Sequence, residues 1–135
     1  MSTLAPILPE LDIWMRAFSR RSPDPLIVHG FTRHVTDRRI LTIGWIRQGL
    51  LARAADERQF VRLEWLMSAY PEIRVLTADH VAAARRTRLL RERGVAVAPW
   101  QALLWAVAER IGGVIWCQDR RYRALQAHGF PLLSA

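Results

Sequence analysis

The sequence predicts an α/β fold: a three-layer α/β/α sandwich with a central, mainly parallel sheet. Short apolar segments suited to strands alternate with longer amphipathic segments suited to helices, which is typical of βαβ units. The run Val114–Trp116 is apolar without alternation, as expected of a strand covered on both faces. The 135 residues, 51% hydrophobic and 24% charged, suit one globular domain and are too few for two stable cores. We therefore expect a single domain over residues 1–135.

The first half of the chain predicts one strand followed by helices. In order, the expected segments are residues 4–8 as a strand, 10–19 as a helix, 20–25 as a loop, 26–40 without a clear pattern, and 42–55 and 56–70 as helices. Pro9 is suited to open the first helix. Thr42 and Asp56 are suited to cap the last two, which are close enough in sequence to form a hairpin.

The second half predicts alternating strands and helices. The expected segments are residues 73–76 as a strand, 78–93 as a helix, 95–98 as a strand, 99–111 as a helix, 114–117 as a strand, a short helix or turn after 119, and 130–133 as a strand. Thr77 is a candidate cap, and Gly94 is placed to end the helix before it. Pro99 is placed to open the next helix.

Composition excludes several classes of protein. No apolar run reaches the ~18 residues that a membrane span needs, and the N-terminus lacks the pattern of a secretory leader. The single cysteine, Cys117, cannot form an intramolecular disulfide or a cysteine-rich zinc site. We therefore expect a cytoplasmic protein that does not contact a membrane.

The positive charge comes from arginine alone. Twenty arginines and no lysines stand against 12 acidic residues, which gives a formal net charge of +8. A guanidinium presents a planar fork of donors to phosphate oxygens, so the pattern suits nucleic-acid binding. The same pattern arises from the codon usage of a GC-rich genome. The charge therefore favours RNA or an acidic partner without saying which.

Three acidic residues lie near the predicted carboxyl ends of strands, where open parallel sheets bind ligands. Glu10 and Asp12 follow the first strand candidate, and Asp119 comes two residues after the strand that ends at Cys117. Each also has a structural explanation: Asp119 suits a helix N-cap, and Glu10 suits the first turn of a helix. Spacing alone therefore identifies no active site.

The order of four stretches along the chain is informative about its family. They are residues 8–14 (Leu-Pro-Glu-Leu-Asp-Ile-Trp), 94–108 (Gly-Val-Ala-Val-Ala-Pro-Trp-Gln-Ala-Leu-Leu-Trp-Ala-Val-Ala), 112–119 (Gly-Gly-Val-Ile-Trp-Cys-Gln-Asp) and 122–133, which begins Tyr-Arg-Ala-Leu and ends Gly-Phe-Pro-Leu-Leu. With the helical hairpin between the first two, they resemble the PIN-domain family, and particularly the VapC-type toxins of bacterial toxin–antitoxin pairs. The resemblance covers nearly the whole chain.

The resemblance implies a nuclease site that uses Mg or Mn held by three or four carboxylates. Carried over position by position, the family's first Asp corresponds to Glu10, its helical Glu to Gln48 and its third acid to Gln101, while Asp119 is retained. Two amides in place of carboxylates remove two negative charges from a site that must hold a dication. Asp12, where the family has a small polar residue, is a possible compensating ligand.

The resemblance also points to residues that contact RNA at the same edge. Arg120, Arg121 and Arg123 follow Asp119, and Trp100 is placed to stack on a base. The alternatives are an exposed helix face for the arginines, or ion pairs between them and Glu10 and Asp119 in a site that no longer holds metal. Family members commonly dimerise, and the apolar hairpin over residues 42–69 is the candidate interface.

Three hypotheses of function follow. The first is a PIN-like protein of nuclease ancestry with a degraded magnesium site, which binds RNA or a protein partner such as an antitoxin. The second is an active Mg- or Mn-dependent endoribonuclease, the toxin of a toxin–antitoxin pair, that uses Glu10, Asp12 and Asp119. The third is an unrelated small α/β domain whose basic charge reflects its genome.

Overall fold

The structure is a computed structural model that describes residues 4–18, 23–36 and 38–133. The described residues form seven helices and four short strands. In chain order these are β1 Ile7–Pro9, α1 Leu11–Ala17, α2 Pro25–Thr36, β2 Thr42–Ile43, α3 Gly44–Leu51, α4 Glu57–Met67, β3 Glu72–Ile73, α5 Thr77–Glu92, α6 Pro99–Ile111, β4 Val114–Trp116 and α7 Arg121–Gln126. The expected loop over 20–25 and the last residue of the first expected helix lie partly or wholly outside the described residues.

All strand pairings are parallel, as the sequence predicts. β1 pairs with β4 in the register Ile7 with Val114 and Pro9 with Trp116, and β2 pairs with β3. Single bridges from Ile7 to Ile40 and from Ile115 to Leu132 extend β1 and β4 at their outer sides. The strands thus form two two-stranded ladders, β1–β4 and β2–β3; the bridge at Ile40, just before β2, places the second ladder beside β1, and the bridge at Leu132 places the C-terminal segment beside β4.

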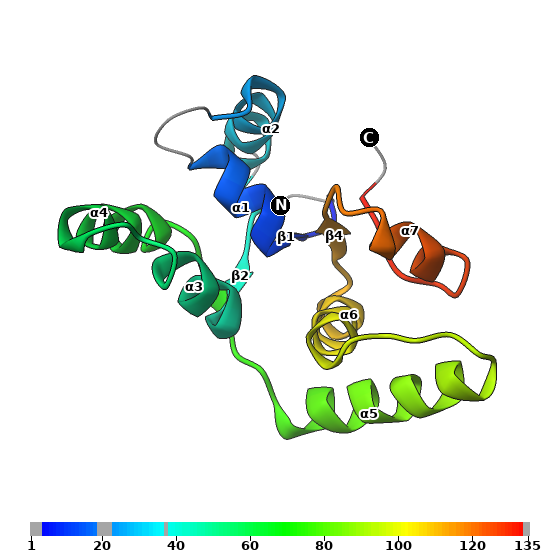
Figure 1. Cartoon of the computed structure of the whole chain (residues 1–135). Coiled ribbons are helices and arrows are strands. Elements are labelled where there is room, and N and C mark those ends of the chain that lie inside the picture. Colours follow the sequence, from blue (N-terminus) through cyan, green and yellow to red (C-terminus); the bar gives the residue numbers. More distant parts are fainter. Residues whose placement is uncertain (1–3, 19–22, 37, 134–135) are drawn as a thin grey trace.

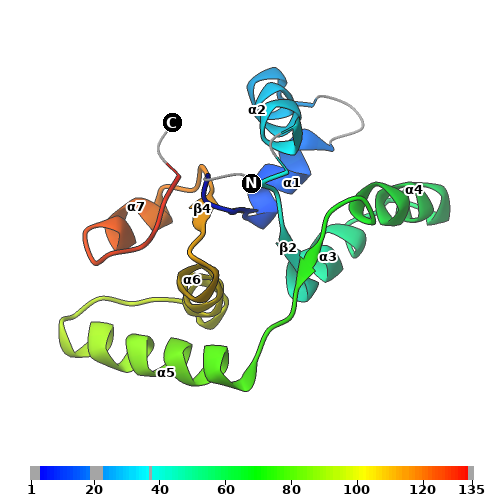
Figure 2. The ribbon, with the colours of Figure 1, turned by 180° about the vertical axis from the view of Figure 1, so that it is seen from behind.

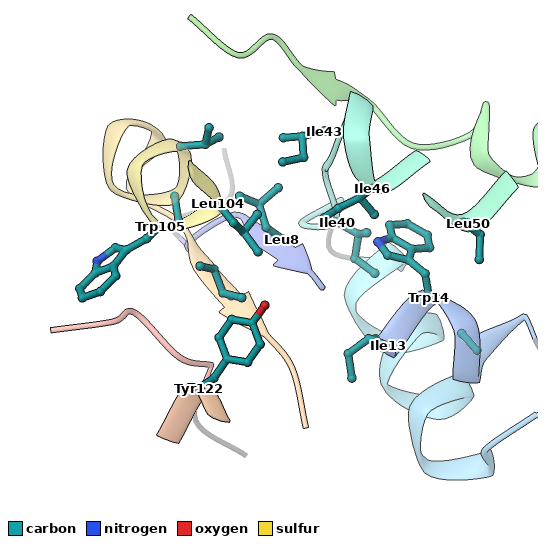
Figure 3. Packing of buried hydrophobic residues seen from close by; sticks show 14 of the residues in the cluster. Leu8, Ile13, Trp14, Ile40, Ile43, Ile46, Leu50, Leu104, Trp105 and Tyr122 are labelled. Atoms are coloured by element: carbon teal, nitrogen blue, oxygen red, sulfur yellow. The ribbon is translucent and has the colours of Figure 1, made fainter. Parts of the chain in front are cut away.

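Helices cover the strands on both sides. Figures 1 and 2 show α1 to α4 on one side of β1 and β4, and α5 to α7 on the other. Leu8 of β1 is fully buried, and Figure 3 shows it between Leu104 of α6 and the Ile40, Ile43 and Ile46 side chains. This arrangement is the three-layer α/β/α sandwich that the alternation of elements predicts.

Several helix boundaries follow the sequence signals directly. The Asp56 carboxylate accepts a hydrogen bond from the Gln59 backbone N–H at 2.8 Å and so caps α4. α6 begins at Pro99, and Gly112 ends it with a φ of +67°. Gly94, with a φ of +75°, follows α5. Glycine adopts this left-handed conformation without the steric penalty of a side chain.

The expected helix over 42–55 is wrong at its start. Thr42 and Ile43 form β2 and are fully buried, and α3 begins at Gly44. The Thr42 backbone N–H donates to the Pro71 carbonyl at 2.9 Å. Pairing with the neighbouring strand therefore makes Thr42 a strand residue, although its local sequence favours a helix cap.

The expected strand over 95–98 is also wrong. This segment connects α5 to α6 without joining a strand of the described sheet. The Val95 N–H closes the turn after α5 by donating to the Leu90 carbonyl, and the Ala98 N–H donates to the Gln101 side chain. Residues 95–98 favour a strand by their composition, but no strand in the described part of the chain lies beside them to pair with.

Other boundaries differ by a few residues. Pro9 is the last residue of β1 rather than the first of a helix, and β3 covers only Glu72–Ile73. Residues 26–40, without a clear pattern in sequence, contain most of α2. The expected C-terminal strand is reduced to the bridge at Leu132. Trp65 of α4 is 73% exposed.

Within the described ranges, no helix has both the length and the apolar character needed to cross a membrane.

Candidate functional site

The candidate site forms where β1 and β4 end side by side. The Glu10 backbone N–H donates to the Trp116 carbonyl at 2.8 Å, directly after the Pro9–Trp116 pair of the ladder. Glu10 then serves as the N-cap residue of α1, and Asp119 lies in the connection from β4 to α7. The topology thus brings the two predicted acids to the same edge of the sheet.

Glu10 is a buried carboxyl, only 5% exposed. Burial raises the pKa of Glu10 above its usual value of 4.5, because the ionised form loses its hydration. The Leu11 N–H at the start of α1 opposes this rise in pKa, and the nearby Asp12 charge adds to it. Burial therefore disfavours the charged form of this side chain relative to an exposed glutamate.

Asp12 is partly committed to the backbone of the neighbouring segment. Its Oδ2 accepts a hydrogen bond from the Gln118 N–H at 3.0 Å, while its buried Oδ1 has no partner among the described residues. Arg16, one turn further along α1, donates to Gln118 Oε1 at 2.9 Å. These contacts fasten the segment after β4 to α1.

Asp119 is paired with an arginine that follows it. Arg121 Nε lies 2.9 Å from Asp119 Oδ2, and the Arg121 backbone N–H donates to Asp119 Oδ1 at 2.9 Å. Hydrogen bonding to the Arg121 side chain holds the pKa of Asp119 below its usual range. For Arg121, the structure therefore shows an ion pair with Asp119, which was one of the alternatives to RNA contact. Arg120 and Arg123 are exposed without ion pairs in the described part of the chain.

A buried tyrosine lies within electrostatic range of all three acids. Tyr122 of α7 is fully buried, and its hydroxyl has no hydrogen bond of good geometry to a described residue. Burial raises the pKa of Tyr122, and the charges of Glu10, Asp12 and Asp119 raise it further. Burial and the same three charges raise the pKa of the Cys117 thiol. Both groups therefore stay protonated.

The two glutamines lie in different environments. Gln101 is buried in the first turn of α6, where its Oε1 accepts a hydrogen bond from the Ala98 N–H at 2.9 Å. It closes the start of its own helix. Gln48 lies on the exposed side of α3. Of the two, Gln101 is buried and Gln48 is exposed.

A row of aromatic rings occupies the space between α3, α6 and α7. The Trp45 and Trp100 ring centroids are 6.0 Å apart, and those of Trp100 and Tyr122 are also 6.0 Å apart. Trp45, in the first turn of α3, thus faces the beginning of α6, three positions before the exposed Gln48. Sequence reasoning missed Trp45; its signal was its position immediately after β2, at the carboxyl edge of the sheet.

A cavity of about 580 Å³ lies beside Asp119. Its walls include the polar side chains of Gln118, Asp119, Arg123 and Gln126 together with the Trp116 ring. Arg123 thus lies next to the candidate site and forms no ion pair with any residue that the structure describes.

The donor groups do not fit the divalent-metal site that the resemblance implies. Mg²⁺ takes about six oxygen ligands in near-octahedral geometry. Over the described ranges, no three His, Cys, Asp or Glu side chains are grouped so that they could hold a metal ion. Burial disfavours the charge of Glu10, Asp119 is bound by Arg121, and the Gln101 oxygen is engaged by its own helix.

Comparison with known proteins identifies the fold. No protein-family model matches the sequence, and no curated protein is significantly similar to it. A chain of the FitAB complex bound to a DNA fragment is similar in structure, with a TM-score of 0.77, 11% identity and coverage of 94% of this chain and 93% of that one. FitAcB from Neisseria gonorrhoeae gives a TM-score of 0.73, 13% identity and coverage of 95% and 96%. VapBC2 from Rickettsia felis, bound to a promoter DNA fragment, gives 0.71, 9% identity and coverage of 87% and 90%.

These structures share the parallel sheet and the covering helices over nearly the full length of both chains. At such low identity the likeness establishes the fold and leaves the chemistry of the site to the residues themselves. The chain has the VapC-type PIN-domain fold of these toxin–antitoxin proteins.

Proposed function

We propose that this chain is a PIN-fold protein that has lost metal-dependent nuclease activity and acts by binding an antitoxin-like protein partner. The observation that carries the proposal is the arrangement around Tyr122. Where the family resemblance requires carboxylates for a metal, this chain has a buried Glu10 whose charged form is disfavoured, an Asp119 bound to Arg121, an engaged Gln101 and the Trp45 ring. These side chains offer Mg²⁺ too few negatively charged ligands to bind it.

A protein partner fits the surface better than RNA. Five arginines already form ion pairs with carboxylates, namely Arg47, Arg86, Arg88, Arg110 and Arg121. Large apolar side chains are exposed on several helices, including Leu26 at 81% and Trp65 at 73%. Such side chains are typical of surfaces that become buried in a complex. The similar structures named above are themselves toxin–antitoxin complexes.

The proposal is tested by metal binding and RNA cleavage. We expect the purified wild-type protein to leave a structured RNA intact in Mg²⁺ or Mn²⁺, and calorimetry to detect no divalent-metal binding at millimolar concentration. Metal-dependent cleavage that Asp119→Asn abolishes would contradict the proposal and support the active endoribonuclease that uses Glu10, Asp12 and Asp119.

A gain-of-binding pair tests which α3 residue faces the site. We expect the triple variant Glu10→Asp, Trp45→Glu, Gln101→Asp to bind Mn²⁺, because it adds carboxylates at positions 45 and 101 to the acids at positions 10 and 119. The matched triple variant with Gln48→Glu in place of Trp45→Glu should bind at least tenfold more weakly, since Gln48 is exposed on α3. Circular dichroism must show that both variants fold. Equal binding by the two would mean that Trp45 does not take the position of the missing acid.

A further inference from the structure

Two adjoining cavities run along one side of α5. The larger, about 660 Å³, is lined mainly by apolar side chains that include Trp45, Ala84, Trp100 and Leu103. The smaller, about 430 Å³, is lined by Arg91 and by residues 94–97. Thr87 lines both. Because the two cavities share Thr87 and lie along the same face of α5, we describe them together as the α5 groove.

The α5 groove has a stripe of one helix as its floor. His80, Ala84, Thr87 and Arg91 are spaced by three or four residues, so they lie on one face of α5. From His80 to Arg91 the helix rises about 16 Å. An extended chain of about five residues spans the same length.

The wall opposite this stripe carries unpaired backbone groups. Residues 95–98 have strand-like sequence, yet neither the N–H nor the C=O of Ala96 or Val97 is hydrogen-bonded to any residue in the described ranges. An extended peptide that lies beside such a segment satisfies these groups as an added strand. Ala96 and Val97 therefore present backbone donors and acceptors with which an extended peptide can form hydrogen bonds.

The chemistry at the two ends of the groove differs. At one end Arg91 is exposed and has no ion-pair partner within the described ranges. At the other end Trp45 and Trp100 form an aromatic wall beside Leu103. A carboxylate suits the first end, and a large apolar side chain suits the second.

We propose that the α5 groove binds an extended segment of the partner protein with an acidic residue at the Arg91 end and an aromatic residue at the Trp45–Trp100 end. This inference rests on the proposed function, because it names the segment by which the partner docks. Of the residues that line the groove, only Arg91 and His80 are basic, whereas a nucleic acid needs a cation near each phosphate. The net charge of +8, together with Arg91 at one end of the groove, favours an acidic partner segment.

The probes are two blocked hexapeptides, Glu-Val-Thr-Val-Ala-Phe and its reverse, because the groove does not fix the direction of the added strand. We expect one of them to shift the indole N–H resonances of Trp45 and Trp100 in NMR spectra and to leave those of Trp14 and Trp65 unchanged. Replacing the peptide's Glu by Lys should weaken binding about fivefold, the effect of one exposed ion pair.

Two matched pairs of variants locate the site. Ala84→Trp fills the groove and should weaken peptide binding at least tenfold, whereas Ala82→Trp, exposed on another face of α5, should not change it. Arg91→Glu should weaken binding about fivefold or more, and Arg85→Glu, exposed outside the groove, should have less effect. Thermal unfolding confirms that each variant is folded.

Three outcomes would overturn the inference. One is the absence of any shift at about 1 mM peptide, a binding free energy weaker than ~−4 kcal/mol. Another is an equal loss of peptide binding in the groove variant and in its matched control variant. The third is a single-stranded RNA oligonucleotide that binds in the groove in place of either peptide. Metal-dependent cleavage by the wild-type protein would instead refute the proposed function, whether or not the peptides bind.

Discussion

At the scale of single residues, burial determines the chemistry of Glu10. Its pKa is raised mainly by desolvation, so the folded state holds the proton more tightly than the unfolded state. The contribution of Glu10 to stability is therefore full below the unfolded pKa near 4.5 and is lost as the pH rises through the folded value. At pH 7 the ionised carboxylate destabilises the fold.

We therefore expect Glu10→Gln to increase the free energy of unfolding at pH 7 by about 1 kcal/mol. The amide carbonyl accepts the same hydrogen bonds from the start of α1 without a charge. Near pH 4 the gain should disappear, because the wild-type carboxyl is protonated there. Urea unfolding of both proteins at the two pH values measures the difference. A loss of stability at pH 7 would show that a cation or hydrogen-bond donor compensates the Glu10 charge.

At the scale of elements, an ion pair between the buried Asp79 carboxylate and the partly exposed Arg110 side chain joins α5 to α6. Asp79, 2% exposed, accepts hydrogen bonds from Arg110 Nε at 2.8 Å and from the Leu76 N–H at 2.8 Å. Arg110 also donates to the Arg74 carbonyl at 2.8 Å. The carboxylate thus closes the start of α5 and attaches it to the end of α6.

Asp79→Ala should lower the free energy of unfolding by about 2 kcal/mol, the combined effect of a lost cap and lost charged hydrogen bonds. Asp56→Ala, which removes only the cap of α4, is the matched control and should cost about 1 kcal/mol. The Arg110 hydrogen bond lowers the pKa of Asp79, so its stabilisation is present above pH 3.8 and is lost as the pH falls through the folded value. Equal effects of the two substitutions in urea unfolding would mean that the pair with Arg110 adds nothing.

At the scale of the whole molecule, the hairpin of α3 and α4 leaves an apolar face uncovered. Trp65 and Val61 are one turn apart on α4 and are 73% and 53% exposed. We expect the protein to dimerise through this hairpin, and Trp65→Ser to raise the dimer dissociation constant at least tenfold, as loss of a central aromatic contact does. Sedimentation velocity over a concentration series measures this. Leu26→Ser, on α2 and outside the hairpin, is the control, and an equal effect there would place the interface elsewhere.

Much of the fold is predictable because its signals are local. Pro99 and Gly112 bound α6, Asp56 caps α4, and the uniform apolar run of β4 indicates a strand covered on both faces. The parallel sheet follows from the alternation of these elements. Glu10 and Asp119 are predicted at one edge of the sheet by the same rule.

The sequence-based predictions of secondary structure are wrong where a residue distant in sequence determines whether a strand forms. Thr42 has the local properties of a helix cap, but the backbone of Pro71 makes it a strand residue. Residues 95–98 have strand propensity, but no described strand lies beside them. Strand identity depends on a neighbour that the local sequence does not contain.

The sequence by itself determined the order of elements, the parallel sheet and the edge at which its acids gather, because capping, periodicity and apolar runs act over a few residues. Only the tertiary structure decided the state of that edge. It buried Glu10, paired Asp119 with Arg121, turned Gln48 outward and brought Trp45 against Trp100. The physical reason is that desolvation and side-chain pairing depend on groups from β1, α3, α6 and α7 that meet only when the chain folds.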